Sequence, residues 1–497
     1  MKIGRISGDP PISCVPLRKS GMNMTTAVAP KAPSETVVVH SRRDILRYLE
    51  DNPRNTPRVG ILFAIAMTSV LADAYDLGSL SIGVSSMTQD LGLTATQIGF
   101  ITSATALGAL ASALVGGIIA DRTGRYKLFI ICAVLLTVAP IGICLSVNFW
   151  MVLFFRVILG IAIGLDMPVA FSFMAELLTK ETNAKFINFW QPLASFSNIL
   201  GVSIALPFAI NAITSHIWRF TVGFGAVIAV VALVLRLKYS EESPQWSAKH
   251  QTLEQAAGVL SKTYDLNVIV EPDGSDDAMA EEEKHGVREL FGQKQRAKTV
   301  LVSICAFAQQ LQYYGVGFYI PVIAAMVFGK DMVSTIVATI CAQGLAMLAG
   351  LLGVRLTSRL GLRRLGLVGY AIVLVCLVWM GLIGVHGGQD ASLLPVFLVA
   401  FLLAGSSFGP GPLSKTLAAV VYPTEIRGIG TGWSETMGRV GSAIGLFFFP
   451  VVLAAIGIKS TMLVIAICPI IAIVALLTVR WGEKSQRQSR LVTPEAG

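Results

Sequence analysis

The stretch VGILFAIAMTSVLADAYDLGSLSIGV (Val59–Val84) decides how this sequence is to be read. It is apolar over more than the roughly 20 residues that a helix needs to cross the hydrocarbon layer of a bilayer. Near its middle, however, it contains two carboxylates, Asp73 and Asp76. A charged side chain at the centre of a transmembrane helix costs about 2.5–3.5 kcal/mol on insertion scales. Two of them in one predicted span therefore indicate a functional site.

The whole chain has the composition of a membrane protein. Its 497 residues are 54% hydrophobic and 14% charged, whereas soluble proteins average about 25% charged residues. Uniformly apolar segments that contain Gly and Pro favour helices over barrel strands, which alternate in polarity. The sequence predicts an all-α membrane protein with twelve transmembrane helices, at 59–84, 98–119, 128–147, 150–175, 187–211, 218–236, 300–327, 333–353, 365–385, 393–420, 429–456 and 460–480.

The basic residues predict the orientation in the membrane. The segment 85–97, after the first span, has no Lys or Arg. Lys and Arg stay on the cytoplasmic side, so both termini are predicted to be cytoplasmic. The net charge of +9 then follows from topology and does not require nucleic-acid binding. The basic loops on which this orientation rests follow spans two and eight and contain Arg122, Arg125, Lys127, Arg359, Arg363 and Arg364.

The spans divide the chain into two bundles. We predict a cytoplasmic tail at 1–58 with a short helix near Arg42–Glu50, a six-helix bundle at 59–236, a cytoplasmic linker at 237–298, a second bundle at 299–480 and a cytoplasmic tail at 481–497. The linker contains one clear helix candidate, Thr252–Tyr264. Seven Cys, without a CxxC motif, are expected to be small buried residues. We expect no metal or other cofactor, only protons as coupling ions.

The two halves repeat each other. GGIIADRTGRYK (Gly116–Lys127) follows the second span and GVRLTSRLGLRR (Gly353–Arg364) follows the eighth, each with Arg, one residue, Gly and further basic residues. Internal repeats in a membrane protein are typical of secondary transporters, whose site lies between the repeats near the midplane.

These motifs resemble those of the major facilitator superfamily. Three further stretches are similar to its sugar-porter branch and to related metabolite and organic-acid proton symporters: RVILGIAIG (Arg156–Gly164), EESPQW (Glu241–Trp246) and YPTEIRGIGTG (Tyr422–Gly432). The resemblance implies two bundles that rock about a central cavity. It also implies a conformational latch in the cytoplasmic loops, although a plain positive-inside loop is an alternative. The predicted latch residues are Gly117, Asp121, Arg122, Gly124, Arg125, Arg359, Glu425 and Arg427.

The acid pair of the first span has a predicted partner. Asp73 and Asp76 are three residues apart and share a helix face. From the helical rise, Asp76 and Arg156 in the fourth span lie at similar depths, about 12 and 9 Å below the outer surface. The resemblance implies that Asp76 carries the proton and that Arg156 controls it; the alternative is a structural ion pair. Asp73 resembles the first acid of a D-G-x-D element in aromatic-acid proton symporters, with a role either in proton relay or in packing or hydration.

A second group of residues is predicted to bind substrate. Lys415 replaces an aromatic residue of sugar porters, and relatives that transport organic anions also have an arginine in the span of Arg439. Glu435 and Arg439 are spaced to pair with each other, and interhelical hydrogen bonding is the alternative role for the Gln and Tyr residues. The predicted set is Gln191, Gln309, Gln310, Tyr313, Tyr314, Lys415 and Arg439.

The sequence therefore predicts a transporter and not an enzyme. The favoured hypothesis is a proton symporter that imports a small, carboxylated metabolite across the inner (plasma) membrane as a monomer. Three alternatives are a neutral sugar or polyol symporter, an efflux antiporter for drugs or metabolites, and a nutrient receptor on a transporter scaffold.

Overall fold

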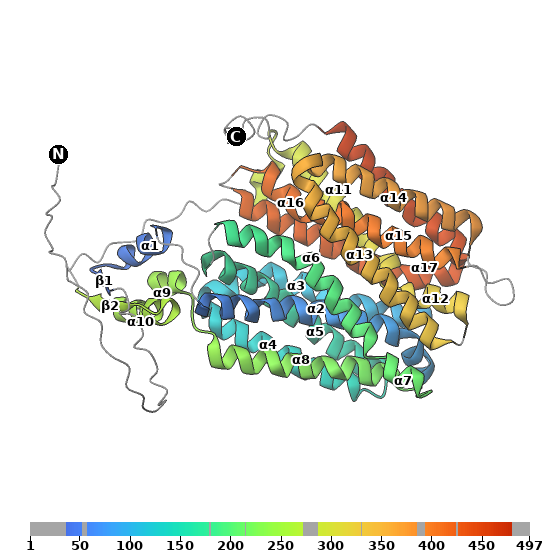
Figure 1. The fold of residues 1–497 in the computed structure, drawn as a ribbon, viewed down its shortest axis with the longest axis horizontal. Coiled ribbons are helices and arrows are strands. Elements are labelled where there is room, and N and C mark those ends of the chain that lie inside the picture. The colour runs from blue at the N-terminus through green and yellow to red at the C-terminus, as the bar shows by residue number, and fades with distance from the viewer. Residues whose placement is uncertain are drawn as a thin grey trace, which may run out of the picture.

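The computed structural model describes residues 36–51, 57–177, 180–213, 215–271, 287–329, 331–384, 393–423 and 426–479. Its long helices lie side by side in two groups, the blue-to-green half of the chain beside the yellow-to-red half (Figure 1). The first half consists of α2 (Pro57–Leu91), α3 (Ala95–Thr123), α4 (Arg125–Cys144), α5 (Phe149–Leu177), α6 (Lys180–Ser203), α7 (Leu206–Ile210) and α8 (Ile217–Tyr239). The second consists of α11 (Arg296–Gln312), α12 (Ile320–Phe328), α13 (Met332–Leu360), α14 (Leu362–Ile383), α15 (Leu394–Phe408), α16 (Pro410–Val421) and α17 (Arg427–Thr478).

The predicted twelve-span fold is confirmed. Ten helical segments in the described ranges are long and apolar enough to cross a membrane. One of them, α17, contains two predicted spans, because Gly457 adopts a left-handed φ of 73° that interrupts the helix. The predicted second span coincides with α3. Two other predicted spans are not regular helices throughout: a π-helical turn (Tyr313–Gly317) separates α11 from α12, and Gly409 separates α15 from α16.

The sequence repeat is matched by a repeat in backbone geometry. Gly124 joins α3 to α4 with φ 91° and ψ 152°, and Gly361 joins α13 to α14 with φ 80° and ψ 151°. Only glycine adopts such angles without a steric penalty. The glycine of each Arg-x-Gly motif therefore makes the same tight turn in both halves.

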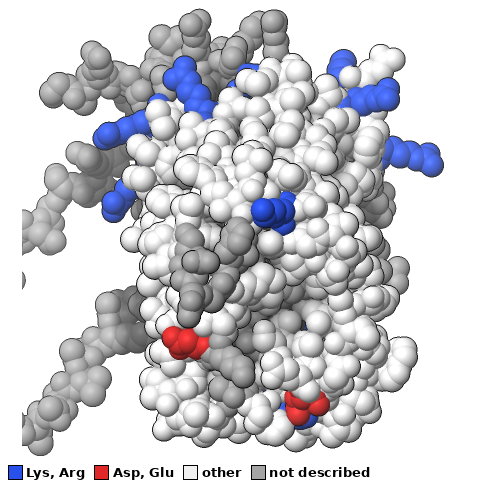
Figure 2. Space-filling model, turned by 90° about the vertical axis from the view of Figure 1, so that its right-hand side faces the viewer, with Lys and Arg blue, Asp and Glu red and all other residues white. Residues whose placement is uncertain are grey.

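Helix surfaces that face away from the bundle are apolar. On α8, Phe220, Val227, Val231 and Val234 are exposed, while Arg236 on the opposite face is buried. Side chains of this kind suit contact with lipid tails. Figure 2 looks onto the outer end of the bundle, and most of the described surface there also belongs to uncharged residues.

The two halves meet through side chains near their outer ends. Gly99 of α3 packs so closely against α17 that a Cβ at this position would lie 2.6 Å from the Phe447 carbonyl oxygen. Thr102 and Tyr319 both donate hydrogen bonds to the Leu446 carbonyl oxygen, at 3.1 and 2.9 Å. One apolar cluster here includes residues from both halves.

The tail and the linker form a joint unit, which the sequence did not predict. Strand β1 (Thr36–Val39) of the tail pairs in parallel with β2 (Asn267–Val270) of the linker. Beside this sheet lie α1 (Arg42–Asp51), α9 (Pro244–His250) and α10 (Leu253–Tyr264) (Figure 1). The predicted helices near 42–50 and 252–264 are therefore confirmed, but in the described residues the tail and the linker are parts of one structure.

Local side-chain contacts fix the helix ends of this unit. Thr252 and Gln255 form a capping box at the start of α10. Burial by itself raises the pKa of Asp44 in α1, but hydrogen bonds from the backbone N–H groups of His40 and Ser41 hold that pKa below its usual value.

Candidate functional site: a cavity with two ion pairs

A cavity lies between the two halves. Its lining combines apolar residues with polar side chains: Val70, Asp73, Ala74, Leu77, Ala194, Asn198, Gln309, Gln310, Tyr313, Tyr314, Gly411, Ser414 and Lys415. Helices α2 and α6 supply the first-half residues, and α11, the π-helical turn and α16 supply the others. An apolar cavity with a few convergent polar groups is typical of a small-molecule site.

The π-helical turn shapes one wall of this cavity. Such turns are rare and often occur at functional sites. Here it contains Tyr313 and Tyr314, whose rings pack edge to face with centroids 5.5 Å apart. Directly before it, α11 presents Gln309 and Gln310 to the same cavity. Five of the seven predicted substrate-binding residues, including Lys415, therefore line one space.

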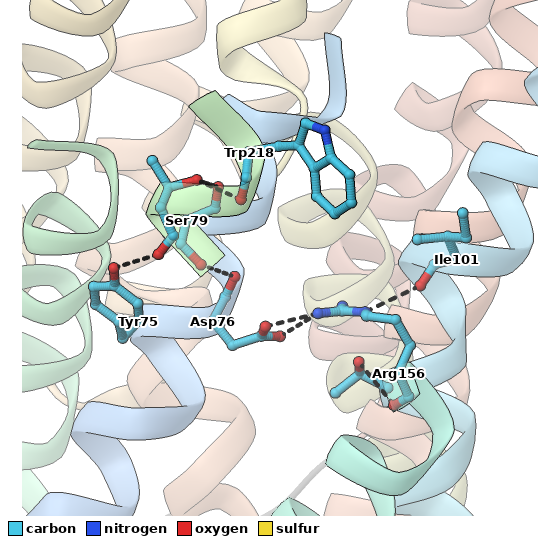
Figure 3. A network of polar contacts seen from close by, with 8 residues as sticks. Tyr75, Asp76, Ser79, Ile101, Arg156 and Trp218 are labelled. Atoms are coloured by element: carbon cyan, nitrogen blue, oxygen red, sulfur yellow. Dashed lines mark hydrogen bonds and ion pairs between the residues drawn. The ribbon is translucent and has the colours of Figure 1, made fainter. Parts of the chain in front are cut away.

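Asp76 and Arg156 form a buried ion pair within the first half. Arg156 Nη1 lies 2.7 Å from both carboxylate oxygens of Asp76 (Figure 3). Arg156 Nε donates to the Ile101 carbonyl oxygen at 3.3 Å, and the side chain is fully buried. The predicted contact between α2 and α5 is present. Its proposed role in proton coupling remains a prediction.

Asp73 contacts the other half of the protein. Its Oδ2 lies 3.7 Å from Nη2 of Arg439 in α17. The exposed fractions of the two side chains are 11% for Asp73 and 21% for Arg439. Because α2 and α17 belong to different halves, this ion pair joins the two bundles at the cavity.

Lys415 also has an acidic partner. Its Nζ contacts the carboxylate of Glu435, which lies on α17 of the same half. The i,i+4 spacing of Glu435 and Arg439 predicts that they partly satisfy each other along the helix. The ion pairs instead run from Glu435 to α16 and from Arg439 to α2, because neighbouring helices bring opposite charges closer than the helix itself does.

A second ion pair in which both residues are buried was not predicted. Arg236 of α8 contacts both oxygens of Asp166 in α5, at 2.6 and 2.9 Å, and both residues are almost fully buried. Arg236 also donates to the Phe129 carbonyl oxygen at 3.0 Å and to Ser69 Oγ at 2.9 Å. An acid in the middle of the predicted fourth span was the available signal, but nothing in the sequence identified its partner.

Two polar cavity residues were also missed. Asn198 lies seven residues, or two helical turns, after Gln191 and so on the same face of α6. That spacing was a usable signal. Ser414 precedes Lys415, and no pattern distinguished it from other small helix residues. The side chain of Gln191 lies outside the described part of the structure, so its predicted role stays a prediction.

The structure describes part of the predicted latch. Both oxygens of Glu242, in the linker motif EESPQW, accept hydrogen bonds from the first backbone N–H groups of α4, at Arg125 and Tyr126. This contact connects the linker directly to the signature loop. Arg359 and Arg427 are exposed near helix ends. Glu425 and the side chains of Asp121 and Arg122 lie outside the described residues; Gly117 falls within α3, and its latch role remains a prediction.

Comparison with known proteins identifies the family. The family model described as "Sugar (and other) transporter" matches residues 63–480, so the chain belongs to this family of membrane transporters. It is 27% identical to the putative metabolite transport protein YwtG of Bacillus subtilis, covering 82% of this chain and 88% of the relative.

Other relatives have named substrates. A D-xylose transporter of Levilactobacillus brevis is 25% identical, covering 81% of this chain and 88% of that protein. A niacin transporter, NiaP of Acinetobacter baylyi, is 22% identical, with 80% and 88% covered. The fold is similar to the inward-open xylose transporter XylE of E. coli, with a TM-score of 0.68, 18% identity, and 87% and 99% covered.

Proposed function

We propose that this protein is a proton-coupled symporter that imports a small organic acid by alternating access. The observation that carries this proposal is the presence of two cations at a cavity whose lining also contains amides, hydroxyls, apolar groups and the carboxylate of Asp73: Lys415 belongs to the lining, and Arg439 lies 3.7 Å from Asp73. Arginine can hold a carboxylate through two hydrogen bonds. The niacin transporter among the relatives, named for a carboxylated substrate, supports this substrate class.

Asp76 and Arg156 are the proposed proton-coupling pair, with Asp73 in support. A carboxylate can bind a proton at one stage of transport and release it at another if its solvation and its distance from a cation change. XylE, whose fold is similar, is itself described as a proton:xylose symporter. We place the protein in the inner membrane, the location given in the name of one relative.

A neutral sugar or polyol is the second candidate substrate. Gln309 and Gln310 favour it, because paired amides at a cavity can bind hydroxyl groups. The relatives named for D-xylose and glucose support the same class. Both cavity cations have acidic partners, so a neutral ligand would leave the cavity with no net charge.

External pH in a lightly buffered suspension of de-energised cells distinguishes these candidates. Benzoate, nicotinate, D-gluconate and D-xylose are added in turn to cells with the wild type or with Asp76→Asn. Alkalinisation with an acid, absent in the variant, would support organic-acid symport through Asp76. Alkalinisation with D-xylose alone would overturn the organic-acid proposal, and equal traces for both proteins would overturn the role of Asp76.

A further inference from the structure

The charges at the cavity balance without a substrate. Two carboxylates, Asp73 and Glu435, contact two cations, Arg439 and Lys415. An anion that entered this arrangement alone would add an uncompensated charge beside Asp73, which is buried, and burial of an uncompensated charge is strongly unfavourable. Binding of an organic acid therefore requires one of the two carboxylates to leave its cation and to lose its charge.

The two pairs differ in how easily they can open. Lys415 and Glu435 are in direct contact and belong to the same half. Asp73 and Arg439 are 3.7 Å apart and belong to different halves, so movement of one bundle against the other separates them. Asp73 also lines the cavity itself, whereas the Glu435 side chain is 46% exposed and can stay charged in water.

We propose that Asp73 occupies the carboxylate site of Arg439 until the substrate's own carboxylate displaces it, and that the displaced Asp73 then holds the transported proton while the anion is bound, in support of the coupling pair Asp76 and Arg156. This inference rests on the proposed function and adds a mechanism of selection and coupling to it. Before the anion binds, the charges of Asp73 and Arg439 sum to zero. Afterwards, neutral Asp73 and the pair of Arg439 with the substrate also sum to zero, so one proton enters with each monocarboxylate.

The surroundings of Asp73 favour this exchange. The groups that act on it are Arg439 of α17, Lys415 of α16, Tyr314 of the π-helical turn and Asp76 of its own helix. Asp76 is held by two contacts of 2.7 Å to Arg156. When Asp73 loses Arg439, the negative charge of Asp76 one helical turn away favours its protonation.

Ligand binding with proton counting tests the proposal. Purified full-length protein in lipid nanodiscs is titrated with benzoate, nicotinate, D-gluconate and D-xylose by calorimetry, in buffers of different ionisation enthalpy. For the wild type, we expect uptake of about one proton per bound anion. In the pH range in which Asp73 is charged before the anion binds, the affinity for the anion should fall about tenfold for each unit by which the pH rises. For Asp73→Asn, we expect binding without proton uptake and with little dependence on pH.

Asp90→Asn is the matched control. It neutralises another acid of α2, which pairs with Arg219 away from the cavity lining, and it leaves the charges at the cavity unchanged, so proton uptake on binding should persist. Anion binding to the wild type without proton uptake would overturn the inference but not the proposed function. Unchanged proton uptake in Asp73→Asn would also overturn it. If D-xylose binds and none of the acids does, the proposed function itself fails. The wild-type proton count does not depend on whether the variants fold.

Discussion

Two acid–arginine pairs lie one helical turn apart on α2, and their surroundings differ. Both carboxylate oxygens of Asp76 lie 2.7 Å from Arg156 Nη1, and both residues belong to the first half of the protein. The Arg156 side chain is fully buried. Asp73 contacts Arg439 at 3.7 Å, between the halves and beside the cavity. The first arrangement holds helices of one bundle together. In the proposed mechanism the second pair breaks when the bundles move or when a carboxylate binds, which would give the two acids of this span separate roles.

The comparison predicts that the largest loss of stability follows from a substitution in the pair of Asp76 and Arg156. Asp76→Asn leaves the buried Arg156 without its charged partner, and loss of one member of a buried pair costs about 3–5 kcal/mol. We expect a marked fall in thermal stability in detergent and loss of proton-driven accumulation of the substrate. The control is Asp90→Asn, at the less buried pair with Arg219, where solvent screening should make the cost smaller. Equal effects at both positions would contradict the distinction.

Substitutions in the pair of Asp166 and Arg236 should change the stability of the protein without changing proton-coupled transport. Asp166→Asn should destabilise the protein by about 3–5 kcal/mol for the same reason, yet folded molecules should retain proton-coupled uptake, because this pair lies apart from the cavity lining. The double variant Asp166→Leu/Arg236→Met removes both charges and should recover part of the lost stability. Thermal unfolding and uptake per folded molecule measure the two effects. Loss of coupling in stably folded Asp166→Asn would assign this pair a transport role.

Arg439→Gln tests the looser pair from its cationic side. Removal of a charge-assisted hydrogen bond costs about 1.5–3 kcal/mol, so affinity for an organic anion should fall roughly 10- to 150-fold. Arg439→Lys keeps the charge but cannot form the bidentate hydrogen bonds of an arginine, so its affinity for the anion should lie between those of the wild type and Arg439→Gln. Competition binding in nanodiscs measures both variants. Wild-type anion affinity in Arg439→Gln would exclude this residue as the carboxylate site.

The smallest expected effect on substrate binding follows from substitution of Asn198, an uncharged residue of the cavity lining. Asn198→Ala removes one hydrogen-bonding side chain, worth about 0.5–1.5 kcal/mol, and should weaken substrate binding between about two- and tenfold. Phe196→Ala on the same helix is the control, because Phe196 is 51% exposed and points away from the cavity lining. The apparent affinity for uptake is the measurement, and equal values for both variants would exclude Asn198 from the binding site.

Much of the fold followed from local sequence rules. Each span was visible because a helix must satisfy its backbone hydrogen bonds inside the bilayer and must be apolar outside. The glycines at 124 and 361 were visible as a repeated motif because only glycine permits their turns. The pairing of β1 with β2 was not visible, because it joins segments more than 200 residues apart, and a four-residue strand gives no signal that identifies its partner.

The sequence by itself predicted the number of spans, the orientation and the family resemblance. The matching depths of Asp76 and Arg156, together with that resemblance, also predicted their contact. Only the tertiary structure decided which cation faces which acid: Glu435 contacts Lys415, Asp73 contacts Arg439, and Asp166 contacts Arg236. The physical reason is that depth fixes a residue's height in the membrane, while its partner depends on how each helix is rotated and which helix lies beside it.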